Sequence, residues 1–160
     1  MKKTITIGVV ILLVIYLFSS YNTLVSTQET YTSQWSQVEN QYQRRFDLIP
    51  NLVGAVQGAM KQETAVFGAI ADARTRYAGA TTQEDKVAAT TQVESALSRL
   101  LVVMENYPQL KSIDTVQNLQ IQLEGTENRV AVERQKYNDT VQTYNLKVKR
   151  FPGMIFAKLF

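Results

Sequence analysis

An unbroken apolar run from Thr4 to Phe18, behind a Met-Lys-Lys start, constrains this 160-residue chain more than any other feature. A helix that crosses a bilayer needs about 20 residues, within a usable range of about 17–25. The run reaches that range when it is extended to Tyr21, because helical Ser and Thr hydroxyls can bond to the backbone. Tyr16 and Tyr21 then lie where aromatic rings favour the membrane interface. We therefore predict one membrane-spanning helix over this segment.

The charges that flank the run predict its orientation. Lys2 and Lys3 precede it, and no further Lys or Arg occurs before Arg44. The positive-inside rule then places the N-terminus in the cytoplasm and the rest of the chain outside. A cleaved secretory signal is the alternative, but no A-x-A-like cleavage site follows Phe18. An uncleaved signal-anchor is therefore favoured, and both alternatives place the rest of the chain on the same side.

The residue types that are missing limit the chemistry of the chain. His and Cys are both absent, which excludes a Ser-His-Asp triad, a thiol nucleophile and any His-bearing zinc or di-iron site. The net charge of +3 is small, and Lys and Arg form no stripe with interleaved aromatic residues. We predict that the chain is not an enzyme and that it takes no cofactor, no metal and no nucleic acid.

Apolar residues recur at helical spacing from Tyr21 to Phe46, and no Gly or Pro separates them from the apolar run. One continuous helix is therefore predicted to leave the membrane. Because proline disfavours helix at the preceding residue and suits the first turn of a new helix, a break is predicted at Pro50. A second helix is then expected over Pro50–Tyr77.

Two further helices complete the predicted body. Thr81 or Thr82 is expected to cap a third helix, which ends at Pro108. A fourth helix is expected to start near residues 112–114 and to stop at Pro152-Gly153. Short connections make sequence neighbours antiparallel. The predicted fold class is therefore all-α: an N-terminal transmembrane helix continues into an antiparallel up-down four-helix bundle of long helices. The predicted domains are the cytoplasmic start and transmembrane helix (1–20), the helical bundle (21–150) and the apolar C-terminal tail (151–160).

The predicted order returns the fourth helix, and the apolar tail 151–160, to the membrane surface. The candidate membrane-surface contacts are Lys147, Lys149, Arg150 and Phe156. Basic side chains near anionic headgroups and apolar side chains in the interface are typical of such a surface. The apolar residues expected in the interface are Phe151, Met154, Ile155, Phe156, Leu159 and Phe160. Packing of the tail on the base of the bundle, with basic residues matching a helix C-terminus, is the alternative.

Two other groups are candidates for helix–helix contact. The predicted second helix carries a row of small residues, Gly54, Gly58, Ala65 and Ala69. Because glycine is unfavourable inside a helix, this row suggests that the backbone of another helix packs closely against it, either within the bundle or from another subunit. Tyr-Asn pairs recur along the chain and begin at Tyr21, Tyr137 and Tyr144. We predict that these tyrosines form a polar layer in the bundle, which is favoured over a ligand site.

The carboxylates Glu63, Glu124 and Glu127 are the candidates for a metal site or for catalysis. Carboxylate-bridged metal bundles use Glu-x-x-His, and the His is absent here. Ion pairs that fix helix register are therefore favoured.

The block RRFDLIPNLV at 44–53 closely resembles the signature of the LemA family. Further matching stretches follow in the same order, at 107–111, 123–129 and 151–153. The resemblance implies a bacterial, single-span, helical protein whose domain lies outside the cytoplasmic membrane, in a family without established enzymatic activity. The resemblance further implies an association with membrane remodelling or with membrane metalloproteases, as in some members of the family. The signature maps onto Arg44, Arg45, Asp47, Pro50 and Asn51, which are expected at the tip of the first hairpin. Two alternatives are open: Arg45 and Asp47 tie the turn, or the signature forms a docking surface for a partner or a neighbouring copy.

These observations favour a non-enzymatic, membrane-anchored scaffold that self-assembles or docks a partner through its helical body. The expected partners are the lipid bilayer and further copies of the chain. An adaptor or regulator of a membrane metalloprotease is the alternative.

Overall fold

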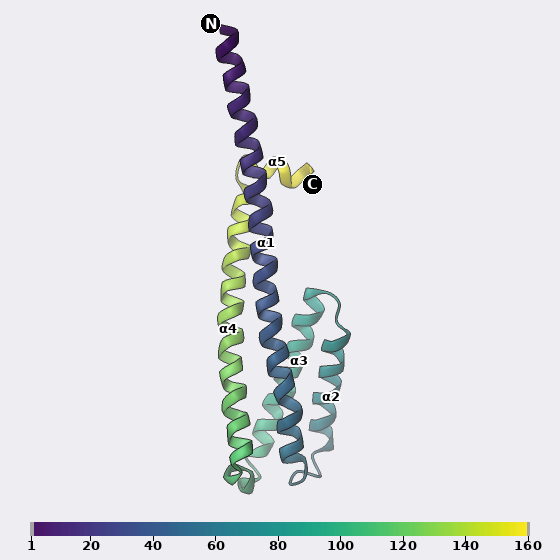
Figure 1. Cartoon of the computed structure of the whole chain (residues 1–160). Coiled ribbons are helices and arrows are strands. Elements are labelled where there is room, and N and C mark those ends of the chain that lie inside the picture. Colours follow the sequence, from purple (N-terminus) through teal and green to yellow (C-terminus); the bar gives the residue numbers. More distant parts are fainter. Residues whose placement is uncertain (1, 160) are drawn as a thin grey trace. The chain divides into compact units, whose positions relative to one another are not determined.

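The computed structural model describes residues 2–159, apart from the side chains of Lys2, Thr4, Lys111 and Leu159. Phe160 and the Leu159 side chain, both expected in the membrane interface, lie outside the described residues. The elements in chain order are α1 (Lys2–Gln57), α2 (Thr64–Gly79), α3 (Gln83–Met104), the 3₁₀ helix η1 (Pro108–Ser112), α4 (Asp114–Lys149) and α5 (Gly153–Leu159) (Figure 1). Residues 2–159 contain no strand. The predicted all-α class is confirmed.

The chain divides into two units. Unit 1 comprises residues 1–40 and 130–160, and unit 2 comprises residues 41–129. Helices α1 and α4 supply residues to both units, whereas α2 and α3 belong to unit 2 and α5 belongs to unit 1. The predicted four-helix bundle over 21–150 stays a prediction. The predicted domain boundaries also stay predictions, because they describe where the chain leaves the membrane, and the two units do not test this. These domains are 1–20, 21–150 and 151–160.

The predicted helix break at Pro50 is wrong. Pro50 lies inside α1, which continues to Gln57. Proline in a helix interior removes one hydrogen bond and costs about 3 kcal/mol. The helix persists because its neighbours Ile49 and Leu52 are fully buried in unit 2, and burying such a side chain contributes about 1.5–3 kcal/mol.

The break comes instead after α1, where residues 58–63 connect it to α2. The backbone N–H groups of Ala59 and Met60 both donate to the Val56 carbonyl at 3.0 Å, which satisfies an otherwise unpaired helix end. Met60 is fully buried and holds the connection against the core of unit 2. The predicted second helix, Pro50–Tyr77, is therefore replaced by α2.

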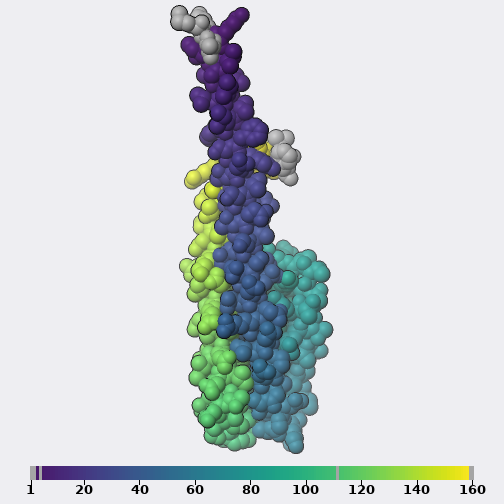
Figure 2. Space-filling view, viewed as in Figure 1, coloured from purple at the N-terminus to yellow at the C-terminus, as the bar shows by residue number. Residues whose placement is uncertain are grey.

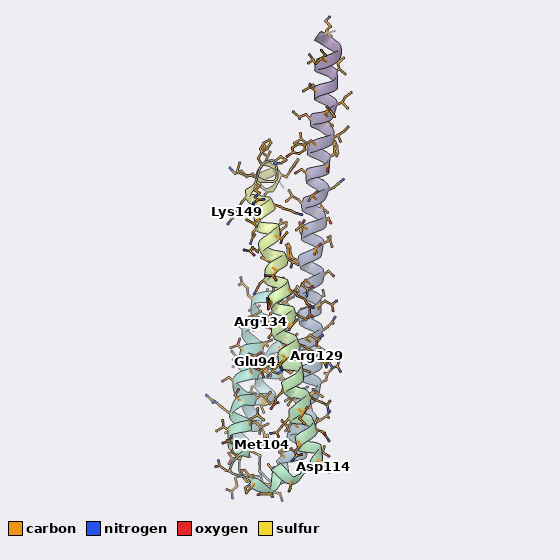
Figure 3. The ribbon with its side chains drawn as sticks, turned by 90° about the vertical axis from the view of Figure 1, so that its left-hand side faces the viewer. Glu94, Met104, Asp114, Arg129, Arg134 and Lys149 are labelled. Atoms are coloured by element: carbon orange, nitrogen blue, oxygen red, sulfur yellow. The ribbon has the colours of Figure 1, made fainter. Side chains whose placement is uncertain are left out.

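The predicted starts of the third and fourth helices are confirmed. Both helices end before the proline that was expected to stop them, and α4 ends at Lys149. Thr82 caps α3, and its Oγ1 accepts a hydrogen bond from the backbone N–H of Asp85 at 3.1 Å. Helix α3 ends at Met104, and α4 begins at Asp114 (Figure 3). Pro108 opens η1 between them, where its missing N–H has no cost.

The core of unit 2 follows from apolar spacing on α1. Tyr42, Phe46, Ile49 and Val56 recur at steps of four, three and seven, and all are buried. The Tyr77 ring of α2 meets the Phe46 ring edge-on, with ring centroids 4.3 Å apart. Helices α1 and α2 are therefore antiparallel, because this contact lies far from the short connection between them.

Of the small residues predicted at a close helix contact, the two glycines make none with the described parts of the chain. Gly54 lies in α1, Gly58 lies in the connection, and Ala65 and Ala69 lie in α2. A Cβ added at Gly54 or at Gly58 would meet nothing within 4 Å. An internal packing role is therefore wrong for both glycines, which leave open space on unit 2.

Unit 1 pairs the first part of α1 with the last part of α4. Tyr31 contacts Tyr144, and Trp35 contacts Tyr137, so the two segments run antiparallel and side by side (Figure 1). Their shared interface is half-buried and largely aromatic. On the face that Figure 2 shows, no other described part of the chain covers the segment of α1 before Leu17.

Candidate membrane-interface site

The N-terminal part of α1 presents apolar side chains on all sides. From Ile5 to Phe18 the large apolar residues are 43–68% exposed, apart from the half-buried Leu17. A helix that is hydrophobic all round is stable only when something apolar surrounds it. Among the described residues, α1 is the one helix long and apolar enough to cross a membrane.

A sharp turn after α4 brings α5 against α1, just beyond this apolar segment. Gly153 packs so closely there that a Cβ would overlap the Lys147 carbonyl oxygen and lie 3.5 Å from the Leu24 side chain. Glycine is therefore required by close backbone approach. The N–H of Met154 donates to the Arg150 carbonyl at 2.9 Å, which closes the turn.

An aromatic contact joins α5 to α1. The Phe156 ring meets the Tyr21 ring edge-on at a centroid distance of 5.8 Å. These two residues and Leu17 and Phe18 line a shallow apolar pocket of about 250 Å³. On the rest of α5 and its turn, Phe151, Met154 and Ile155 stay exposed, at 69%, 46% and 43%. The Phe156 ring thus contacts α1, while other apolar side chains in the described part of the tail stay exposed.

The end of α4 and the tail that follows it are basic. Lys147, Lys149, Arg150 and Lys158 all follow Asp139, after which the sequence has no acidic residue. Lys149 lies at the end of α4, and it is exposed (Figure 3). Lys147 is half-buried, and its Nζ donates to Thr27 Oγ1 at 2.7 Å. Lys147 and Phe156 both contact α1, whereas Lys149 and Arg150 are exposed, and the predicted membrane-surface role of these four residues stays a prediction.

The three tyrosines predicted as a polar layer lie at successive levels of unit 1. Tyr21 pairs with Phe156, Tyr144 with Tyr31 at 5.0 Å, and Tyr137 with Trp35 at 5.3 Å. Burial raises the pKa of the Tyr31 hydroxyl, and the neighbouring Tyr144 raises it further. They form a ladder of ring contacts rather than one layer.

One polar cluster crosses the same interface. Gln34 Nε2 donates to Glu133 Oε2 at 2.6 Å, and Lys136 Nζ donates to Glu133 Oε1 at 2.8 Å. The hydrogen bond from Lys136 lowers the pKa of Glu133, and the hydrogen bond from Gln34 lowers it further. Partial burial of the carboxylate acts in the opposite direction, but the pKa stays lowered. The ionised carboxylate thus helps to hold the register of α1 on α4.

The signature residues lie inside α1, so their expected place at the tip of the first hairpin is wrong: the connection to α2 is formed by residues 58–63. Arg45 is buried, and its guanidinium bonds to Glu94 at 3.4 Å and to Glu127 at 3.3 Å. The sequence suggested instead that Arg45 ties a turn with Asp47. That pairing is wrong, because Asp47 accepts a hydrogen bond from Gln43 at 2.9 Å.

The remaining signature residues Arg44, Asp47, Pro50 and Asn51 are exposed. Their docking role stays a prediction. Glu94 was not singled out from the sequence, since nothing local marks it as the partner of an arginine 49 positions away.

The candidate acidic residues do not converge. Glu63 accepts a hydrogen bond from the Tyr107 hydroxyl at 3.2 Å, and Glu127 pairs with Arg45. Burial raises the pKa of Tyr107, and the hydrogen bond to Glu63 adds to it. Within the part of the chain that the structure describes, no three His, Cys, Asp or Glu side chains are grouped as metal ligands.

The fold and this site define an all-α protein with one exposed helix suited to a membrane and a basic, apolar tail beside it. The LemA family model matches residues 34–160. The chain therefore belongs to the LemA family, as its signature indicated.

Two curated relatives are the magnetosome proteins MamQ 1 and MamQ 2 of Paramagnetospirillum magneticum. Each is 28% identical over 167 residues, which cover 88% of this chain and 61% of the relative. The magnetosome protein MamQ of Magnetospirillum gryphiswaldense is 32% identical over 65 residues, or 41% of this chain and 24% of the relative. The chain thus spans about three-fifths of the length of the first two relatives.

Proposed function

We propose that this protein is a non-enzymatic scaffold, anchored in a bacterial cytoplasmic membrane by the first part of α1, whose helical body self-assembles or docks a partner. The observation that carries the proposal is the dual use of α1. Its first part exposes apolar side chains on all sides, and its last part supplies buried core residues of unit 2. Similarity to magnetosome proteins supports a role at a membrane.

The proposed anchor is uncleaved, with the N-terminus in the cytoplasm and the body outside it. Lys2 and Lys3 support this orientation. The four basic residues after Asp139 favour the opposite side, but the positive-inside rule counts only about 15–20 residues from a membrane span. Protease added to intact spheroplasts should digest unit 2. Full protection of unit 2 would overturn this orientation.

Self-assembly is proposed to use the open surface at Gly54. Because a Cβ there meets nothing inside the chain, a second copy can approach the α1 backbone closely. Gly54→Leu should therefore block the contact without disturbing internal packing, and the lost glycine favours the helix by up to about 1 kcal/mol.

The experiment is amine crosslinking of the full chain in native membranes, followed by gel electrophoresis and mass spectrometry. The matched control is Gly68→Leu in α2, where a Cβ also meets open space. We expect a ladder above the 18.1 kDa monomer that weakens in Gly54→Leu and persists in the control. A monomer alone would refute self-assembly, and specific crosslinks only to a membrane metalloprotease would favour the adaptor alternative.

A further inference from the structure

An open groove of about 670 Å³ runs along α1 in unit 1 and ends at Lys147. Its first part is apolar, lined by Val14, Ile15 and Phe18. Its second part is polar and uncharged, lined by the α1 residues Ser19, Asn22, Thr23, Ser26 and Thr27. The groove therefore changes from apolar to polar in one direction and finishes at a cation, with no carboxylate along its lining.

The Lys147 ammonium is positioned but incompletely bonded. It donates to Thr27 Oγ1, whose own hydrogen is donated to the Thr23 carbonyl at 2.7 Å. An ammonium carries three N–H donors, so among the described residues two of them are left for another acceptor. No carboxylate pairs with Lys147 in the part of the chain that the structure describes.

The depth of this cation matches the phosphate layer of a bilayer. A hydrocarbon core takes about 20 helical residues, so a span that begins at Thr4 leaves the core near Thr23. Thr27 lies four residues further, about 6 Å along the helix. The headgroup layer adds about 5–7 Å on each side of the core. Lys147, bonded to Thr27, thus lies at headgroup depth.

We propose that this groove binds one anionic phospholipid, with an acyl chain along Val14–Phe18 and the phosphate on Lys147. Asn22 and Ser26 lie between these two ends and offer uncharged hydrogen-bonding groups to the headgroup. This inference rests on the proposed membrane span of α1. A single charge-assisted contact of this kind changes lipid preference by about fivefold, since each basic residue contributes about 1 kcal/mol at an anionic surface.

The test is native mass spectrometry of the full chain, released from nanodiscs of equal phosphatidylglycerol and phosphatidylcholine. We expect one retained phosphatidylglycerol per chain. Lys147→Met should lower the preference for phosphatidylglycerol by about fivefold or more. The matched control is Lys149→Met, which removes the same charge from an exposed residue two positions on, about 200° around the helix. The control should still retain one phosphatidylglycerol per chain, seen as a single lipid adduct in the mass spectrum.

A second pair of variants tests the groove without touching the charge. Ser26→Phe fills the groove beside Lys147, whereas Ser33→Phe adds the same ring to an exposed part of α1 outside it. We expect only Ser26→Phe to lose the adduct. Equal losses from Lys147→Met and Lys149→Met would show diffuse attraction and overturn the proposal. Binding of inorganic phosphate alone, without retained lipid, would overturn it as well.

The two proposals fail in different ways. If α1 does not span the membrane, the protein is released by alkaline carbonate and no nanodisc incorporates it, which refutes the anchor itself. If the protein incorporates normally but shows no preference that depends on Lys147, only the lipid site is refuted.

Discussion

Replacing Pro50 by alanine distinguishes a continuous α1 from a helix that ends before residue 50. Pro50 is exposed, so the substitution removes no buried contact. In the helix interior, alanine restores an N–H that donates to the carbonyl of residue 46 and removes the clash of the proline ring. The gain is about 3 kcal/mol, less about 0.4–1 kcal/mol because the unfolded chain becomes more flexible. We expect a net stabilisation of about 2 kcal/mol.

The assay is urea unfolding of the full chain in mild detergent, followed by far-ultraviolet circular dichroism. A gain of about 2 kcal/mol raises the midpoint without changing the slope and raises Tm by about 4–8 °C for a chain of this size. Gly54→Ala is the control, because Gly54 is exposed in α1 as Pro50 is. This substitution should raise the free energy of unfolding by only about 1 kcal/mol, through helix propensity.

A neutral or destabilising Pro50→Ala would refute this reasoning. That result is expected if Pro50 lay in the first turn of a new helix, where proline is favourable and its N–H is unpaired in any case.

Three further predictions follow from single contacts. Gly153→Ala should displace α5, which is measured as reduced disulfide crosslinking between Tyr21→Cys and Phe156→Cys; unchanged crosslinking would contradict the close approach. Glu94→Gln should cost about 1 kcal/mol of unfolding free energy, less than the about 3–5 kcal/mol of a fully buried pair, because Glu94 is 34% exposed. Because folding lowers the pKa of Glu133 from 4.5, the ionised carboxylate stabilises the folded protein above pH 4.5, and this stabilisation is lost as the pH falls below that value. On acidification, Tm of Glu133→Gln should therefore fall less than Tm of the unmodified protein.

Local chemistry could be predicted wherever one short segment carried it. The apolar run before Phe18 and the Thr82 cap depend on neighbouring residues in sequence, and both are present as expected. The aromatic contacts of Tyr21, Tyr137 and Tyr144 were expected as one polar layer, but they lie at separate levels because each ring meets a different residue of the partner segment.

The helical class, the apolar segment, the family signature and the starts of α3 and α4 could all be predicted from the sequence, because each follows from residue spacing or from one capping side chain. Tertiary structure alone decided that α1 continues through Pro50, since burial of Ile49 and Leu52 outweighs the local preference of proline. It also decided that Arg45 pairs with Glu94 and that Lys147 reaches Thr27. Such partners lie 49 and 120 positions apart, and only packing of the helices brings them within hydrogen-bonding distance.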